Sequence, residues 1–374
     1  MSAAKQTVIL QEFRGIKSGP EHEQSYTENL HVCQAAVKEA AEDGNLQRLG
    51  HACRGAAESL RRVGKLRDAD EQLSRSLACF RTVEDISGAA WSLWALANLR
   101  RQTGRFNEAR SLLCTAADHG ARVRDRKLVI YALAGLAETS RILGDFSAAD
   151  REHYRAYTMF REDNDLRGIV WALEGTAQIL RFTGKSRAAL ERFSEAQRLA
   201  TAGGDMRGLA YALKCRAETL SDLGHHHAAI IDAQVAVSTF EGLDFAVGTA
   251  YAKKSLGDVF RKAGRPLEAF DEYQAALARF QALGETRGEA YTCLGFARWY
   301  ADVGSGESAA LQLDCAARYF QRHGVLLGQA NCRDLSTELF RKFGKKAAET
   351  RNAILWNGTA MRGRFSGQLV EAGK

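Results

Sequence analysis

The sequence predicts an all-α solenoid of about eight antiparallel helix pairs. Eight glycines recur 40 residues apart with no insertion between them: Gly64, Gly104, Gly144, Gly184, Gly224, Gly264, Gly304 and Gly344. A fixed period of this length is typical of stacked structural repeats, in which each unit packs only on its neighbours. The chain has only two prolines in 374 residues and is rich in alanine and leucine, which favours helices over a loop-rich β-fold.

Each repeat is predicted to hold two helices, as the fifth copy illustrates. Residues 208–222 fit a first helix and residues 228–240 a second one, and Gly224 separates them because glycine accepts the left-handed backbone that ends a helix. The segments 204–208 and 284–288 are predicted to be turns between repeats. A phenylalanine column late in the second helices is predicted to pack in the core: Phe80, Phe160, Phe240, Phe280 and Phe320.

These features resemble the tetratricopeptide-repeat family, whose unit of about 34 residues has small residues in its first helix and a glycine at its turn. The period of 40 and the lack of a proline after the second helix look like the long-repeat branch that binds regulatory peptides. The resemblance covers nearly the whole chain and implies a right-handed superhelix. We therefore predict an N-terminal segment (1–25), a repeat array (26–350) and a C-terminal tail (351–374).

Composition and charge limit the kinds of partner that the chain is expected to bind. The net charge is +7 and the pI is about 9.0, but basic and acidic residues are interleaved, which argues against nucleic acid. The eight cysteines are scattered, and three consecutive histidines from His225 point in different directions on a helix, so no metal site or cofactor is predicted. The first residues lack the apolar core of a signal peptide, and no apolar run is long enough to span a membrane. We therefore expect a cytoplasmic protein with no membrane partner.

Helical spacing identifies the stripe of each first helix that faces away from the buried positions. Along it lie an aromatic residue, a variable residue, an acid or amide, and an arginine, and the family resemblance implies that this stripe lines the concave surface. The candidate ligand-binding residues are Trp91, Trp94, Asn98, Arg101, Tyr131, Glu138, Arg141, Trp171, Glu174, Gln178, Arg181, Tyr211, Lys214, Glu218, Tyr251, Lys254, Asp258, Arg261, Tyr291 and Arg298.

This stripe predicts a protein-interaction scaffold or regulator that binds a peptide segment in its groove. Arginine offers five donors in a fixed geometry that suits carboxylates, so the partner is expected to carry acidic side chains or a carboxylate. A competing interpretation is structural. Acids and arginines three residues apart, such as Glu58 and Arg61, can pair within one helix, and the aromatic column can pack on the preceding second helix, where the phenylalanine column lies.

The fifth copy departs from this pattern. Ser221 stands where an arginine is expected, so Glu218 lacks its usual partner in the helix. Lys214, Lys254 or a ligand can supply the missing charge; drift between copies is the alternative explanation.

Two further functions remain open. If the superhelix encloses a cavity, carboxylates desolvated by Trp171 and Tyr211 could act as acids or bases in an enzyme that converts a small natural product. Its catalytic candidates are Glu174, Glu218 and Asp258, with Arg181 and Lys214 stabilising charge. The third function is a cytoplasmic receptor for a short signalling peptide. The pattern leaves open the partner, the pathway, the oligomeric state, the place of the terminal segments, and whether the groove is open or closed.

Overall fold

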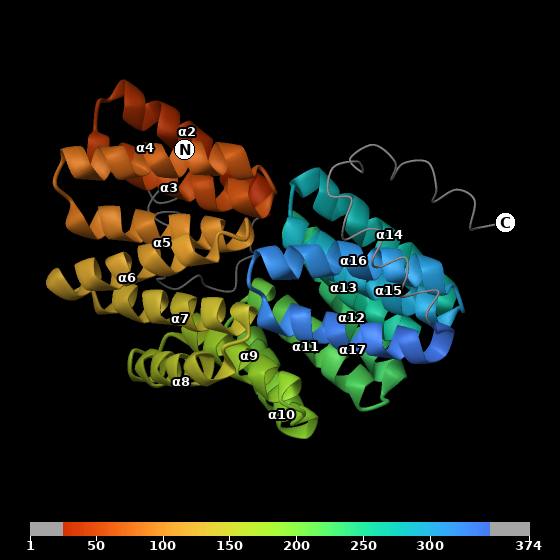
Figure 1. The fold of residues 1–374 in the computed structure, drawn as a ribbon. Helices are drawn as coiled ribbons and strands as arrows, with labels where there is room; N and C mark the ends of the chain where they lie inside the picture. Colours follow the sequence, from red (N-terminus) through yellow and green to blue (C-terminus); the bar gives the residue numbers. More distant parts are fainter. Residues whose placement is uncertain (1–24, 345–374) are drawn as a thin grey trace.

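The computed structural model describes residues 25–344, and this part of the chain consists of sixteen α-helices (Figure 1). The helices are α2 (Tyr26–Glu42), α3 (Leu46–Arg62), α4 (Leu66–Thr82), α5 (Ile86–Gln102), α6 (Phe106–Arg122), α7 (Arg126–Leu143), α8 (Phe146–Glu162), α9 (Leu166–Phe182), α10 (Ser186–Ala202), α11 (Met206–Asp222), α12 (His226–Gly242), α13 (Ala246–Lys262), α14 (Pro266–Leu283), α15 (Thr286–Asp302), α16 (Gly306–Arg322) and α17 (Leu326–Phe343). The predicted C-terminal tail, and nearly all of the predicted N-terminal segment, lie outside the described residues.

Successive helices pack antiparallel on one another in a right-handed superhelical solenoid. The odd-numbered helices α3 to α17 are the first helices of the repeats, and the even-numbered helices α2 to α16 are the second helices. The predicted fold class is confirmed. Helices α11 and α12 each begin two residues before the predicted positions. The side chain of Asp205 caps α11 by accepting a hydrogen bond from the backbone N–H of Gly208, so the predicted turn 204–208 already contains the first residues of the helix.

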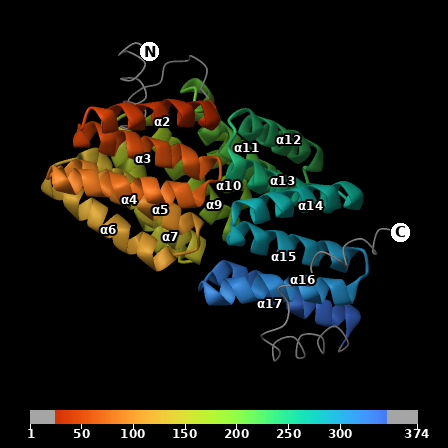
Figure 2. The ribbon, with the colours of Figure 1, turned by 90° about the horizontal axis from the view of Figure 1, so that it is seen from above.

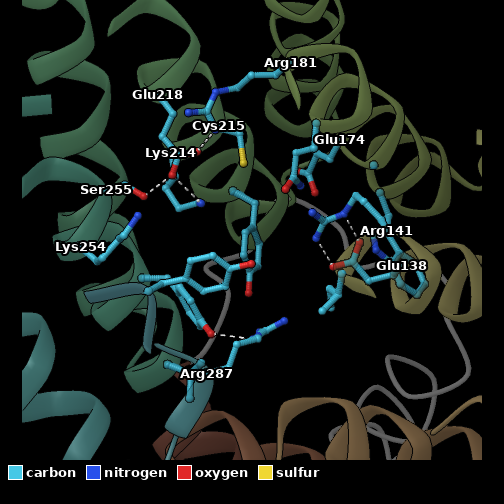
Figure 3. A pocket seen from close by; sticks show the side chains of 18 of the residues that line it. Glu138, Arg141, Glu174, Arg181, Lys214, Cys215, Glu218, Lys254, Ser255 and Arg287 are labelled. Atoms are coloured by element: carbon cyan, nitrogen blue, oxygen red, sulfur yellow. Dashed lines mark hydrogen bonds and ion pairs between the residues drawn. The ribbon is translucent and has the colours of Figure 1, made fainter. Parts of the chain in front are cut away.

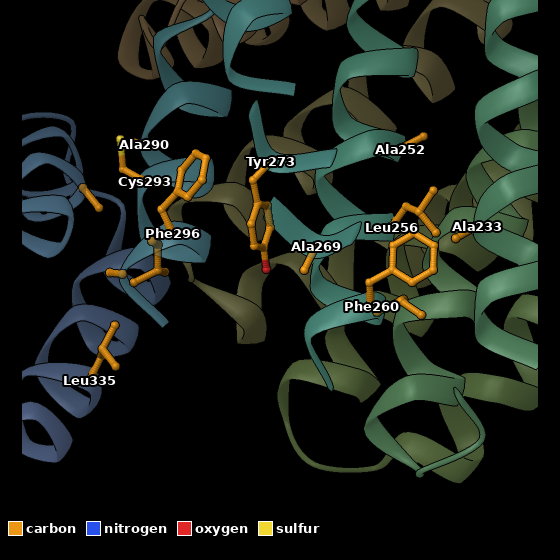
Figure 4. Close-up of a cluster of buried hydrophobic side chains, with 14 of the residues drawn as sticks. Ala233, Ala252, Leu256, Phe260, Ala269, Tyr273, Ala290, Cys293, Phe296 and Leu335 are labelled. Atoms are coloured by element: carbon orange, nitrogen blue, oxygen red, sulfur yellow. The ribbon is translucent and has the colours of Figure 1, made fainter. Parts of the chain in front are cut away.

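Glycines serve two roles, one in the turns and one in the packing of the helices. Gly224 adopts a left-handed backbone with φ of 83° directly after α11, as the turn between the helices of a pair requires. Gly88 lies against the buried ring of Phe80, and a Cβ atom there would come within 2.3 Å of that ring. The whole predicted phenylalanine column is buried. The core continues into the last repeats, where Leu256, Tyr273 and Phe296 pack between α13, α14 and α15 (Figure 4).

Successive turns of the superhelix touch, because repeats that lie five apart along the chain are in contact. The backbone N–H of Tyr26 donates to the carbonyl of Leu243 at 2.9 Å, and the Tyr26 ring packs edge-on against Phe245. Farther along the array, Nδ1 of His323, after α16, lies 3.2 Å from the carbonyl oxygen of Gly104, after α5. Helix α3 also contacts α13, and α7 contacts α17 (Figures 1 and 2). These contacts between turns surround a central cavity.

Candidate functional site

The central cavity has a volume of about 770 Å³ and is lined mainly by the first helices of the pairs, from α3 to α17. Pockets of about 300–1,000 Å³ are the size that holds small ligands. The structure brings all of the predicted ligand-binding residues to this cavity except Trp91. The Trp91 indole donates instead to the carboxylate of Asp125 at 2.9 Å and packs edge-on against Trp94.

Positive charge dominates the lining. Ten arginines and three lysines face the cavity, against six carboxyl groups, among the residues that the structure describes. A cavity with such an excess of cationic groups attracts anions, and its low-dielectric walls strengthen that attraction. Some of these cations pair with carboxylates outside the lining, as Arg261 does with Asp302 and Arg287 with Glu285. The pairing of each group therefore decides which charges remain for a ligand.

Glu218 on α11 is the most completely paired carboxylate of the cavity (Figure 3). It accepts from Nζ of Lys214 at 3.1 Å, from Nη1 of Arg181 on α9 at 2.5 Å, and from the hydroxyl of Ser255 on α13. Burial alone would raise the pKa of Glu218, but Lys214 and Arg181 outweigh burial and hold it well below the ordinary carboxyl range. The arginine that copy five lacks in its own helix is thus supplied by copy four, and Lys214 is a partner as predicted.

Asp258 on α13 is held in the same way. It accepts from Nζ of Lys254 at 2.5 Å and from the hydroxyl of Tyr273 at 2.7 Å. Its pKa is lowered because Lys254 and these hydrogen bonds outweigh the effect of burial. Glu218 and Asp258 are therefore stably ionised carboxylates, a state poorly suited to proton transfer near neutral pH.

Pairing within one helix accounts for only part of the acid–arginine pattern. Glu138 and Arg141 form a two-pronged pair, with nitrogen–oxygen distances of 2.6 and 2.8 Å, and Glu58 pairs with Arg61 at 2.9 Å. Arg181 instead reaches the next repeat, as does Arg261, which contacts Asp302 on α15 at 2.6 Å. The arginine column therefore ties neighbouring repeats together as well as lining the cavity.

Glu174 on α9 differs from the other carboxyl groups. Its side chain is 8% exposed, and within residues 25–344 its Oε1 atom has no hydrogen-bond partner. Burial, and next the neighbouring Asp205, raise the pKa of Glu174 well above the ordinary carboxyl range. Of the three candidate catalytic carboxyl groups, only Glu174 has a pKa shifted toward the protonated form that an acid or a hydrogen-bond donor needs.

Among the cations of the cavity, Arg101 on α5 is buried and differs from most others in its pairing. Its guanidinium donates to the side-chain oxygen of Asn98 at 2.8 Å and to the carbonyl of Gly135 at 3.3 Å, and no carboxylate of the described chain pairs with it. Burial, together with the positive charges of Arg61, Arg287 and Arg141, lowers the pKa of Arg101 to about 10. Arg298 on α15 likewise forms no ion pair in the described structure.

The aromatic column has a packing role. Tyr131 packs against Phe160 at 5.2 Å and Tyr251 against Phe280 at 4.7 Å between ring centroids, so the competing structural interpretation holds for these rings. The phenylalanines belong to the following second helix and not to the preceding one. The polar ends of the rings also connect repeats, because the Tyr131 hydroxyl donates to Asp165, the cap of α9, at 3.0 Å. The rings nevertheless line the cavity with one edge.

Sequence reasoning missed one row of cavity residues: Arg167, Arg207 and Arg287. Each lies four residues before an aromatic residue of the predicted stripe and extends that stripe by one helical turn. The sequences around Arg207 and Arg287 were expected to be turns, but carboxylate caps start α11 and α15 early enough to include them, and Asp165 does the same for Arg167 at α9. An acid followed after two residues by arginine and glycine was the signal that could have identified them.

In residues 25–344 no helix is both long enough and apolar enough to cross a membrane, and no three His, Cys, Asp or Glu side chains are grouped as metal ligands would be. No family model matches the chain, and no curated protein resembles it significantly in sequence.

Solved structures resemble it in fold. The chain is similar to a Rap protein complexed with competence and sporulation factor, with a TM-score of 0.56, 14% identity, and coverage of 93% of this chain and 100% of that one. It is similar to NprR in complex with its cognate peptide NprX, with a TM-score of 0.57, 13% identity, and coverage of 91% and 99%. It is also similar to the apo form of the quorum sensor NprR from B. thuringiensis, with a TM-score of 0.55, 13% identity, and coverage of 94% of this chain and 98% of that one. The predicted tetratricopeptide-type helical fold is thereby confirmed.

Proposed function

We propose that this protein is a regulator that binds a short peptide inside its superhelix. The observation that carries this proposal is the central cavity, in which thirteen cationic side chains face six carboxyl groups. A ligand that fits must be small enough to be enclosed, and it must bring negative charge. A short peptide with an acidic side chain or a free carboxylate meets both conditions.

Arg101 supports this choice because its two hydrogen bonds go to neutral oxygens and no carboxylate of the described chain forms an ion pair with it. Burying an unpaired guanidinium is costly, and a ligand carboxylate would remove that cost. The resemblance in fold to the Rap protein and to NprR, both solved with signalling molecules, supports a peptide receptor more than a passive scaffold. A ligand that contacts successive turns of the superhelix would change the fit of the seam at Tyr26 and Leu243.

The proposal is tested with synthetic hexapeptides. Two pools, one rich in Asp and Glu with free carboxyl ends and one neutral with amidated ends, are dialysed against the protein and quantified by mass spectrometry. We expect retention of the acidic pool only. Arg101→Gln should weaken retention by about ten-fold or more, since hydrogen bonds to charged groups are worth about 1.5–3 kcal/mol.

The matched control is Arg155→Gln, which changes an exposed arginine on α8 and should leave retention unchanged. X-ray scattering with the best retained peptide then tests the receptor function, for which we expect a ligand-dependent change in dimensions. Equal retention of the two pools by the unaltered protein would contradict the assignment of an anionic ligand to this cavity. So would retention of the acidic pool by the Arg101→Gln variant at the level of the unaltered protein.

A further inference from the structure

Glu174 is the one cavity carboxyl group in the described chain with neither an ion pair nor a capping role. Glu138, Glu218, Asp222 and Asp258 each contact a lysine or arginine, and Asp205 caps α11. Oε1 of Glu174 is buried without a hydrogen-bond partner in the described part of the chain. In Figure 3 the Glu174 carboxyl points toward the centre of the cavity.

The charged groups around Glu174 do not neutralise it. Asp205, at the start of α11, and Glu138 on α7 both disfavour its ionised form. Arg207 and Lys214 on α11 favour that form, but Lys214 forms its hydrogen bond with Glu218.

Three other side chains near Glu174 leave the balance unchanged. Arg141 on α7 is held by both oxygens of Glu138. Tyr211 and Cys215 on α11 are neutral, since burial raises the pKa of both, that of Cys215 to about 11. The protein thus maintains a buried carboxyl group facing an internal space, with its nearest cations committed elsewhere or outweighed.

We propose that Glu174 binds a positively charged nitrogen of the ligand, so that the cavity selects a zwitterionic peptide with its amino end at Glu174 and its acidic groups at the arginines. This inference rests on the proposed peptide-binding function and adds an orientation to it. An ammonium group fits because it supplies the donors and the charge that Oε1 lacks. Elsewhere in the lining, the excess of arginine and lysine would repel an ammonium group, which makes Glu174 the distinguishing position.

Proton release is a specific consequence. In the empty cavity the protonated form of Glu174 is favoured, because burial and Asp205 raise its pKa. A bound ammonium favours the ionised carboxylate, so the carboxyl proton leaves to solvent when the ligand binds. Affinity for a free amino end should therefore increase as the pH rises through the raised pKa of Glu174, while affinity for a blocked amino end should not.

The experiment compares two pools of acidic hexapeptides without lysine or arginine, identical except that one has free amino ends and the other is N-acetylated. Equilibrium dialysis with mass spectrometry measures retention by the full chain. We expect about ten-fold or greater preference for the free pool. Glu174→Gln should reduce this preference to near equality, and Glu191→Gln, on the exposed face of α10, should leave it intact.

A second readout does not depend on any variant. The best retained free peptide is titrated calorimetrically into the unaltered protein in two buffers of different ionisation enthalpy, and we expect proton release on binding that the acetylated form does not cause. Equal retention of the two pools, or binding without proton release, would overturn the role of Glu174 and leave the peptide proposal standing. Retention of neither pool would overturn both.

Discussion

Two sides of the same cavity differ in whether their charged side chains form ion pairs within the protein. On the wall made by α11 and α13, Glu218 and Asp258 are each satisfied by side chains of the protein, including Arg181 from the neighbouring repeat. On the wall made by α5 and α9, Arg101 and Glu174 remain without an ion pair in the described structure. The repeats that supply the two walls are built alike, so the difference lies in the pairing of side chains and not in the backbone.

The comparison separates structural charges from those available to a ligand. A buried ion pair that is complete contributes to the folded state and has little left to offer an incoming group. A buried charge or carboxyl group without a partner costs stability, and it persists where binding recovers that cost. The α11–α13 wall therefore holds the repeats together, and the α5–α9 wall is the side that we expect to meet the ligand.

Removing the central carboxylate of the paired wall should have the largest effect. Glu218→Gln leaves Lys214 and Arg181 without their shared partner, and breaking a buried pair in this way costs about 3–5 kcal/mol. Urea denaturation followed by circular dichroism should show the corresponding loss in the free energy of unfolding. A loss no larger than that of the exposed control Glu191→Gln would show that the network is not structural.

The Glu138–Arg141 pair offers a pH test of intermediate size. Arg141 outweighs burial and lowers the pKa of Glu138 to about 2. The folded state therefore gains stability from this carboxylate above its ordinary pKa, and the gain disappears as the pH falls toward 2. At neutral pH we expect the free energy of unfolding of the unaltered protein to exceed that of the Glu138→Gln variant by about 2 kcal/mol. Denaturation series at falling pH should show the two proteins converging; a constant difference would exclude the lowered pKa.

Glu174→Gln should have the smallest effect on stability and the opposite sign. Because the pKa of Glu174 is raised in the folded state, the unfolded chain ionises first, and stability is lost as the pH rises above the ordinary carboxyl pKa. Replacement by glutamine removes this loss, so we expect a gain of about 1 kcal/mol at neutral pH that vanishes in acid. Thermal unfolding at several pH values measures it, and a destabilised variant at neutral pH would mean that Glu174 is already paired.

The fold could be predicted from sequence because its period is unbroken, and the cavity stripe because helical spacing fixes which residues share a face. The charge partners could not be predicted in the same way. Arg181 reaches Glu218 in the next repeat, and this contact depends on how neighbouring first helices pack. The contact between Tyr26 and Leu243 depends on the accumulated twist of the array, which no single repeat encodes.

Contact between successive turns of the superhelix has a consequence for how this protein can evolve. In an open solenoid, repeats can be gained or lost with little harm, because each unit touches only its neighbours. Here Gly104 must meet His323, and Gly64 leaves so little room beside Leu283 that a Cβ atom would lie 1.9 Å from it. Inserting or deleting one 40-residue unit would bring different residues to the junction, so the number of repeats is itself under structural constraint.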